Sequence, residues 1–401
     1  MIGPENEGVD AMFDTRQEFD HLIDQYAGEF DQLSQYIYDH PELQHKEYKS
    51  SQAHVDLLRR HGFQVDYPYM GIETAFRAEY QSDKEGPTLA YLSEYDALPG
   101  IGHGCGHNLL GATTTGTGII MRYLVDHFGG RVVVLGTPAE ETEGAKVDMA
   151  AGDTFDDIDV AFCTHPADQY FKSESSLSME AIEFTYYGKT AHAAQAPWEA
   201  INALDGVVSL YHSVSLYRHQ MRPTSRIHGV ISDGGQAANV IPDKATIQFY
   251  VRDVTLKKMN QLHDKMLAMA EAAAIATGTR MEWRYYEYTY HDLITNQVLF
   301  DRFNQRMSEI GIEMVDRQGS VGSLDMGNVS HVVPVINPYF SMTGGQPVTG
   351  HTREFRDYTL TESGKQGMRN MIYGLVTSSL DLIRDKDLMD QVQAEFQATD
   401  K

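Results

Sequence analysis

Four loops of this chain offer side chains that can bind a transition metal. The thiol, imidazole and carboxylate groups concerned belong to Cys105, His107, Glu140, Glu141, His165 and His351. Each loop either contains several glycines or follows directly on an apolar run. This mixture of donors suits Zn, Mn, Ni, Co or Fe better than Ca or Mg, which prefer oxygen ligands alone. The pattern therefore predicts a site for transition-metal ions.

Each of these residues also fits a plainer structural role when it is taken alone. A single loop histidine such as His165 is more often structural, and a single cysteine is more often a small buried apolar side chain. Cys105, however, has a glycine on either side, which suits close approach of the backbone to an ion better than core packing. Glu140 and Glu141 could form a solvated turn, but two carboxylates in one loop also allow one to bind metal and the other to move protons.

The elements that must position these loops indicate an α/β fold. Short apolar runs typical of buried strands occur in TLAYLSE, RVVVLGTP and DVAFCTHP, and HNLLGATTTGTGIIMRYLVDHF between the first two predicts a helix. The small residues of that helix suit a crossover packed closely on a mostly parallel sheet. Ligands of such sheets gather beyond the carboxyl ends of the strands, which is where the donor loops begin.

The middle of the chain has a different order of predicted strands and helices. Between about residues 177 and 290 the predicted order is strand, helix, strand, strand, helix, strand, which is the ferredoxin-like βαββαβ pattern. We expect this segment to be a compact domain inserted into the first one, whose two parts are then residues 1–176 and 291–401.

Composition excludes several classes of protein. The chain has 401 residues, 42% of them hydrophobic, and a formal net charge of -25, which disfavours nucleic acid and anionic membranes as partners. The first fifteen residues lack a basic and an apolar segment, and no apolar stretch approaches eighteen residues, so we expect a cytoplasmic protein. Its two cysteines, Cys105 and Cys163, are then not expected to form a structural disulfide.

In these motifs the sequence resembles the dinuclear metallopeptidases that include carboxypeptidase G, aminoacylase and succinyl-diaminopimelate desuccinylase. The resemblance is closer to their amidohydrolase branch, with indoleacetyl-amino-acid hydrolases, aminobenzoyl-glutamate hydrolases and β-alanyl-dipeptidase-like enzymes. In that branch D-A-L-P is followed by H-x-C-G-H, here residues 96–99 and 103–107. The resemblance extends from HPEL near residue 40 to GHTREF near residue 351, although Glu94 stands where the branch often has Asp.

The resemblance implies a metallopeptidase catalytic domain that holds two divalent ions, which would be Zn, Mn, Ni or Co. The ligands that it implies are Cys105, His107, Glu141, His165 and His351. Glu140 would be the general base that takes a proton from a metal-activated water, and Asp96 would support catalysis. Segment 177–290 would serve as a lid and as the surface of a homodimer.

Three residues of that inserted segment are given roles by the same resemblance. His192, in GKTAHAAQAPWEA, would reach the active site of the partner subunit, and Asn239 and Arg252 would bind substrate. The plainer alternatives are that His192 and Asn239 complete turns and that Arg252 forms a surface ion pair.

The function that follows is hydrolysis of the amide bond of N-acyl amino acids or small dipeptides. The segment GSLDMGNVSHVVP resembles the dipeptidase-like group, whereas a p-aminobenzoyl-glutamate-type hydrolase is the alternative. A non-catalytic binding protein on the same fold would not need a complete set of ligands and base. A single-metal deaminase or a thiol hydrolase with Cys105 as nucleophile is a further alternative, but a nucleophilic thiol has no use for the glutamate pair and two more loop histidines.

Overall fold

The computed structural model describes residue 13, residues 15–317 and residues 322–401, and it divides into two compact units. The first unit consists of Met1–Glu174, Ile294–Ser320 and Asn328–Asp400. The second consists mainly of Ser175–Leu293, with the short segment Val321–Gly327. The segment 177–290, expected from the sequence to be an inserted domain, falls inside the second unit.

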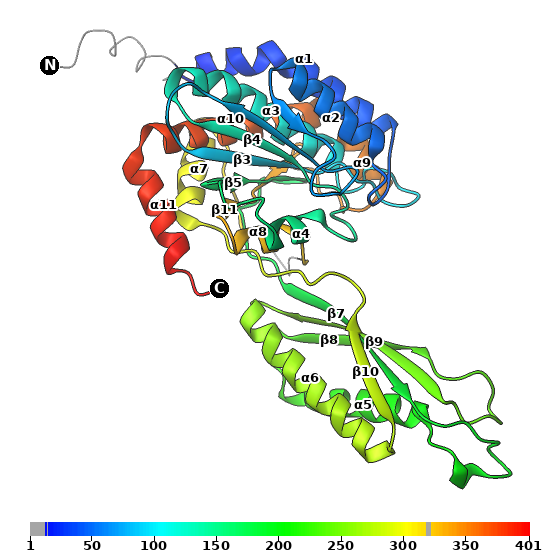
Figure 1. The fold of residues 1–401 in the computed structure, drawn as a ribbon. Helices are drawn as coiled ribbons and strands as arrows, with labels where there is room; N and C mark the ends of the chain where they lie inside the picture. Colours follow the sequence, from blue (N-terminus) through cyan, green and yellow to red (C-terminus); the bar gives the residue numbers. More distant parts are fainter. Residues whose placement is uncertain (1–12, 14, 318–321) are drawn as a thin grey trace. The chain divides into compact units, whose positions relative to one another are not determined.

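The first unit is built on a six-stranded sheet in the order β1-β2-β4-β3-β5-β11 (Figure 1). Its strands are β1 (Gln64–Asp66), β2 (Phe76–Gln81), β3 (Thr88–Ser93), β4 (Arg131–Gly136), β5 (Val160–Phe162) and β11 (Val335–Ile336). The four strands from β4 to β11 pair in parallel, while β1 and β2 continue the sheet in antiparallel fashion. Every residue of β3 and β5 is buried, which explains their uninterrupted apolar runs and confirms the predicted α/β fold with a mostly parallel sheet.

One predicted strand is divided in the structure. The run DVAFCTHP was expected to be a single strand, but β5 ends at Phe162, and β6 (His165–Ala167) pairs with β12 (Tyr339–Ser341) in a separate two-stranded sheet. Pairing of residues 165–167 with β12 separates this segment from the main sheet, and Pro166, which has no N–H to donate, is tolerated in the short strand because it lies in a two-stranded sheet. The break leaves His165 at the start of a short strand beyond the main sheet.

Helices cover the sheet of the first unit. Those outside Ser175–Leu293 are α1 (Arg16–Asp39), α2 (Tyr48–Arg60), α3 (His107–Phe128), α4 (Ala145–Ala151), α7 (Gln297–Glu309), α8 (Met326–Ser330), α9 (Arg353–Tyr358), α10 (Glu362–Arg384) and α11 (Lys386–Ala398). The predicted crossover helix, α3, packs on β3 and β4, and α1 and α10 pack on α3 in turn (Figure 1). Among the helices of the described residues, none combines the length and apolarity that crossing a membrane requires.

The glycines of α3 allow this close packing, as the sequence predicts. A Cβ added at Gly111 would lie 2.5 Å from the backbone oxygen of Glu94 and 2.9 Å from Nε2 of His54. We therefore expect Gly111→Ala to destabilise the protein by about 1–3 kcal/mol through overpacking. Gly28 in α1 is the matched control, since a Cβ there meets nothing within 4 Å and alanine should stabilise the helix by about 0.5–1 kcal/mol. Urea unfolding of both variants tests this difference, and equal midpoints would contradict it.

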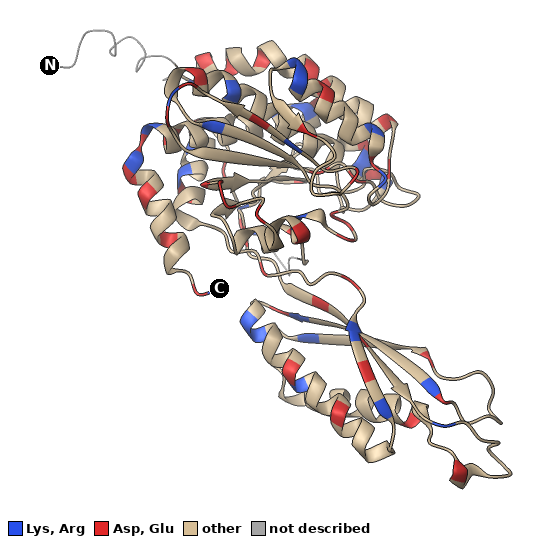
Figure 2. Ribbon diagram, in the orientation of Figure 1, with Lys and Arg blue, Asp and Glu red and all other residues tan. Residues whose placement is uncertain are grey.

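The second unit has the predicted βαββαβ order. Its elements are β7 (Ser178–Tyr187), α5 (Ala203–Tyr217), β8 (Arg226–Asp233), β9 (Lys244–Asp253), α6 (Leu256–Thr277) and β10 (Arg280–Tyr285). The strands form an antiparallel sheet in the order β10-β7-β9-β8, and α5 and α6 pack together on it around an apolar core of their own. Figure 2 shows acidic residues along the ribbons of both units, in keeping with the formal net charge of -25.

Candidate metal centre

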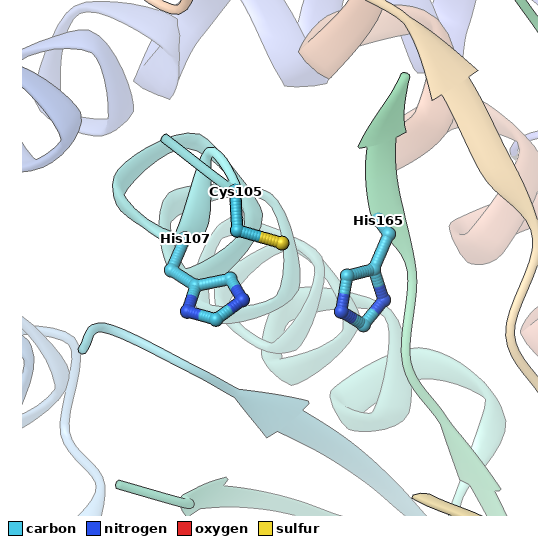
Figure 3. A group of neighbouring side chains, drawn as sticks. All are labelled: Cys105, His107 and His165. Atoms are coloured by element: carbon cyan, nitrogen blue, oxygen red, sulfur yellow. The ribbon is translucent and has the colours of Figure 1, made fainter. Parts of the chain in front are cut away.

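The five predicted metal ligands lie together in the first unit and form two donor sets that share one thiol. Ligand atoms of Cys105, His107 and His165 lie within 4.8 Å of one another, and so do those of Cys105, Glu141 and His351. Figure 3 shows the sulfur of Cys105 pointing into the space between the rings of His107 and His165. Two neighbouring sets with a common thiol could hold a pair of ions.

Close packing at the start of α3 brings the first donor set together. Gly106 precedes the helix in the left-handed conformation, with φ of 80°. A Cβ at this position would lie 2.8 Å from Cγ of Pro166, the residue that follows His165. Glycine therefore allows the loop that carries Cys105 to lie against the short strand that carries His165.

Two non-glycine residues with positive φ shape the other donor loops. Ala139 has φ of 63°, and its N–H donates to Oε1 of the buried Glu47 at 3.0 Å. His351 has φ of 61°, and its N–H donates to the carbonyl of Gly104 at 2.8 Å. Such conformations are costly for residues with a Cβ and are retained mostly at functional sites. They direct Glu140, which follows Ala139, and His351 toward the cluster.

Buried acceptors orient both histidines of the first set. Nδ1 of His107 lies 3.0 Å from Oδ1 of Asp96, and Nδ1 of His165 lies 3.2 Å from Oδ1 of Asn337. With Nδ1 as the donor, each neutral ring keeps the lone pair of Nε2 for an ion. Oδ2 of Asp96 also accepts the N–H of Glu141 at 3.1 Å. Asp96 therefore positions a ligand ring and the loop of the glutamate pair.

Electrostatics favours the ionised forms of Asp96 and Cys105. Burial alone would raise the pKa of both groups. The charge and hydrogen bond of His107 nevertheless lower the pKa of the Asp96 carboxyl. His107 and His351 together lower the pKa of the Cys105 thiol, and the thiolate is the form that binds metal.

Several polar atoms of the cluster are buried without a hydrogen-bond partner in the described part of the chain, and they fit a bound cation. Within the described residues, Oε2 of Glu94, Nε2 of His107 and Oε1 of Glu141 are buried without a hydrogen-bond partner. Leaving such an atom unsatisfied costs roughly 1–3 kcal/mol. Oε1 of Glu141 lies 3.3 Å from Nε2 of His351, close to the separation of about 3.3 Å between neighbouring ligands of a tetrahedral ion with bonds of about 2.0–2.1 Å.

The structure also places two residues at the cluster that the sequence did not assign to it. Glu94 joins His107, Glu140 and His165 in a further group of potential ligands. Lys146, in α4, is fully buried, with Nζ 2.9 Å from Oε1 of Glu94. The sequence signals for Glu94 are its place at the end of the run TLAYLSE and its position where the amidohydrolase branch often has Asp, whereas a single lysine in a polar segment gave none.

The three predicted site residues of the inserted segment all lie in the second unit. His192 and Asn239 are exposed on neighbouring loops, where His192 pairs with Val240 and the N–H of Ala193 donates to the carbonyl of Asn239 at 3.0 Å. Arg252 is half-buried on β9, and its Nη1 donates to Oγ of Ser323 at 3.1 Å.

Sequence relatives cover most of the chain. Residues 178–277 match a family described as a peptidase dimerisation domain. The Xaa-Arg dipeptidase of Mus musculus is 34% identical over 395 residues, which cover 93% of this chain and 90% of the relative. One of the polypeptides of the p-aminobenzoyl-glutamate hydrolase of Escherichia coli is 29% identical, with 75% of this chain and 64% of that polypeptide covered.

A solved structure shares the fold. The crystal structure of a dinuclear metal-binding peptidase of the M20 family from Bacillus subtilis superimposes with a TM-score of 0.66 at 17% identity, covering 87% of this chain and 98% of that one.

Proposed function

The chain belongs to the M20 family of metal-dependent peptidases and amidohydrolases, and we propose that it hydrolyses the amide bond of dipeptides or related N-acyl amino acids at a two-metal centre. The observation that carries this proposal is the pair of donor sets that share Cys105, with Glu140 beside them. When bound, two divalent ions supply polarisation of the amide carbonyl and a lowered pKa of water. We propose that Cys105, His107, Glu141, His165 and His351 hold them.

Glu140 is the residue of this chain that we assign to proton transfer. Its carboxylate lies at the edge of the cluster, with Oε2 3.8 Å from Nε2 of His107, and its side chain retains some exposure to solvent. A carboxylate so placed can accept a proton from the attacking water and deliver it to the leaving amine. Glu141, whose N–H is held by Asp96, remains available as a ligand, so the two adjacent glutamates take different roles.

The substrate class follows from the relatives and is tested by a hydrolysis screen. Identity of 34% over 93% of the chain to an Xaa-Arg dipeptidase makes dipeptides with a basic C-terminal residue the first compounds to test. The screen, run on protein loaded with Zn, Mn, Ni or Co, includes β-alanyl dipeptides, N-acyl amino acids and p-aminobenzoyl-glutamate. Hydrolysis of p-aminobenzoyl-glutamate alone would replace the dipeptide proposal, and no hydrolysis with any metal would refute an amidohydrolase.

We assign dimerisation and substrate binding to the second unit. It presents exposed apolar side chains on its edge strand β8, where Val230 is 60% exposed, and on α5, where Leu216 is 54% exposed. An exposed apolar edge of this kind favours pairing with a second copy. Arg252 would bind the substrate carboxylate through its guanidinium fork, and Asn239 would hold the substrate backbone. His192 would stabilise the developing negative charge in the partner's active site.

Hybrid dimers test whether His192 acts on the partner subunit. Chains with Glu140→Gln and chains with His192→Ala should each be nearly inactive as homodimers. Co-expressed in equal amounts, they should recover about a quarter of wild-type activity, because half of the dimers are hybrids and one of the two sites in each hybrid is complete. Separately tagged chains allow the hybrids to be purified and assayed. No recovery in purified hybrids would show that His192 acts within its own chain or not at all.

A further inference from the structure

Glu94 lies among the side chains that could bind metal, although it is not one of the five predicted ligands. It follows β3 directly and is fully buried. Its Oε2 is 3.2 Å from Nε2 of His107 and also 3.2 Å from Nε2 of His165. Both separations are close to the distance of about 3.3 Å that divides two ligands of a tetrahedral ion.

In the neutral form in which a histidine binds metal, the two rings make these contacts unfavourable unless a cation lies between them. Both rings have Nδ1 beside an oxygen acceptor, so in the neutral tautomer each Nε2 carries a lone pair. Oε2 of Glu94 then faces two nitrogen lone pairs, and it has no hydrogen bond within the described residues. Three electron-rich atoms at such separations repel one another unless a positive ion lies among them.

A buried lysine fixes the other side of the same carboxylate. Nζ of Lys146 lies 2.9 Å from Oε1 of Glu94, and both side chains are fully buried. A buried ion pair of this kind forms only against a large desolvation cost. It leaves Glu94 ionised, with Oε1 held by Lys146 and Oε2 directed at the two histidines. Gly111 lies against the backbone oxygen of Glu94, so the position of the chain is also restricted.

We propose that Glu94 is a sixth metal ligand, which binds through Oε2 to the ion held by His107 and His165, while Lys146 holds Oε1. The proposal rests on the metal centre of the proposed function and adds a residue to it. Lys146 is then a positioning residue, because it acts on the ion only through the Glu94 carboxylate.

Metal binding by a double variant separates a ligand from a residue that only neutralises Lys146. Glu94→Gln alone removes the negative charge of a buried ion pair and can lose metal because the site is distorted. Glu94→Gln combined with Lys146→Met removes both charges of the pair, so we expect it to fold, as thermal unfolding of the metal-free protein by circular dichroism will show. Glu180→Gln is the matched control, since it neutralises another buried carboxylate, paired with His263 in the second unit.

The readout is the number of zinc ions per chain after equilibrium dialysis at a series of buffered free zinc concentrations. We expect wild type and Glu180→Gln to bind two ions. The double variant should bind one ion as wild type does and the other at least about tenfold more weakly, since even residues that only orient ligands contribute 10–100-fold to affinity.

Each result either supports the assignment or overturns it. If the double variant binds two ions with wild-type affinity, Glu94 is not a ligand. This conclusion is clearest if Glu94→Gln alone loses one ion and the added Lys146→Met restores the binding of that ion. A double variant that fails to fold without metal would also overturn it, because the pair would then be structural. Wild type that binds no zinc would instead refute the metal centre of the proposed function, so the two failures are distinguishable.

Discussion

Replacing Glu140 with glutamine should lower kcat by at least about a hundredfold while the protein keeps its metal ions. The substitution removes the group that takes up a proton and retains a side chain of nearly the same shape. General acid–base catalysis contributes roughly 10²–10⁴ to rate, and the ligand set that we assign does not include Glu140. Steady-state kinetics on the substrate found in the screen, with elemental analysis of the same sample, measures both quantities.

Glu143 provides the matched control for this experiment. It is the third glutamate of the same loop and is exposed to solvent, so Glu143→Gln should leave kcat within about twofold of wild type. Activity of Glu140→Gln above a tenth of wild type would refute its role as general base. Loss of metal from Glu140→Gln would show that it is a ligand, which would exchange the roles of the two adjacent glutamates.

Replacing Cys105 with alanine should weaken the binding of both ions, because its thiol belongs to both donor sets. We expect each ion to bind at least about tenfold more weakly, with a corresponding loss of activity at limiting metal. Reconstitution with cobalt gives a second readout, since the thiolate-to-cobalt absorption band of the wild type should disappear.

The other cysteine of the chain is the control for Cys105. Cys163 is fully buried, and its sulfur lies 3.8 Å from the carbonyl oxygen of Leu92 and 3.6 Å from Oε1 of Glu94. Cys163→Ala should therefore reduce stability by about 1 kcal/mol but retain two ions and the cobalt band. An unchanged metal content in Cys105→Ala would show that the thiol is not a ligand.

The parts of the fold that could be predicted from sequence are those that local pattern determines. Buried strands such as Thr88–Ser93 give continuous apolar runs, and the glycines of α3 indicate close packing on the sheet. The donor loops were predictable for the same reason, since each follows a recognisable strand or lies in a glycine-rich segment. The βαββαβ order of the second unit was predictable because its strands and helices alternate with clear boundaries.

What the sequence could not show depends on contacts between distant segments. Lys146 occurs in a polar stretch and would ordinarily be solvated, but the fold buries it against Glu94, 52 positions earlier in the chain. The separation of β6 from β5 depends on pairing with Tyr339–Ser341, which no local pattern indicates. The orientation of the two site histidines likewise depends on Asp96 and Asn337, the second of which lies 172 positions from its ring.

The most direct test of a dinuclear hydrolytic centre is to measure bound metal and amide hydrolysis together on the same full-length protein. We predict two divalent ions per chain, loss of hydrolysis when a chelator removes them, and recovery of activity in proportion to the metal returned, up to two equivalents. Full hydrolytic activity in protein shown by elemental analysis to contain no metal would contradict the account and would favour Cys105 as a nucleophile.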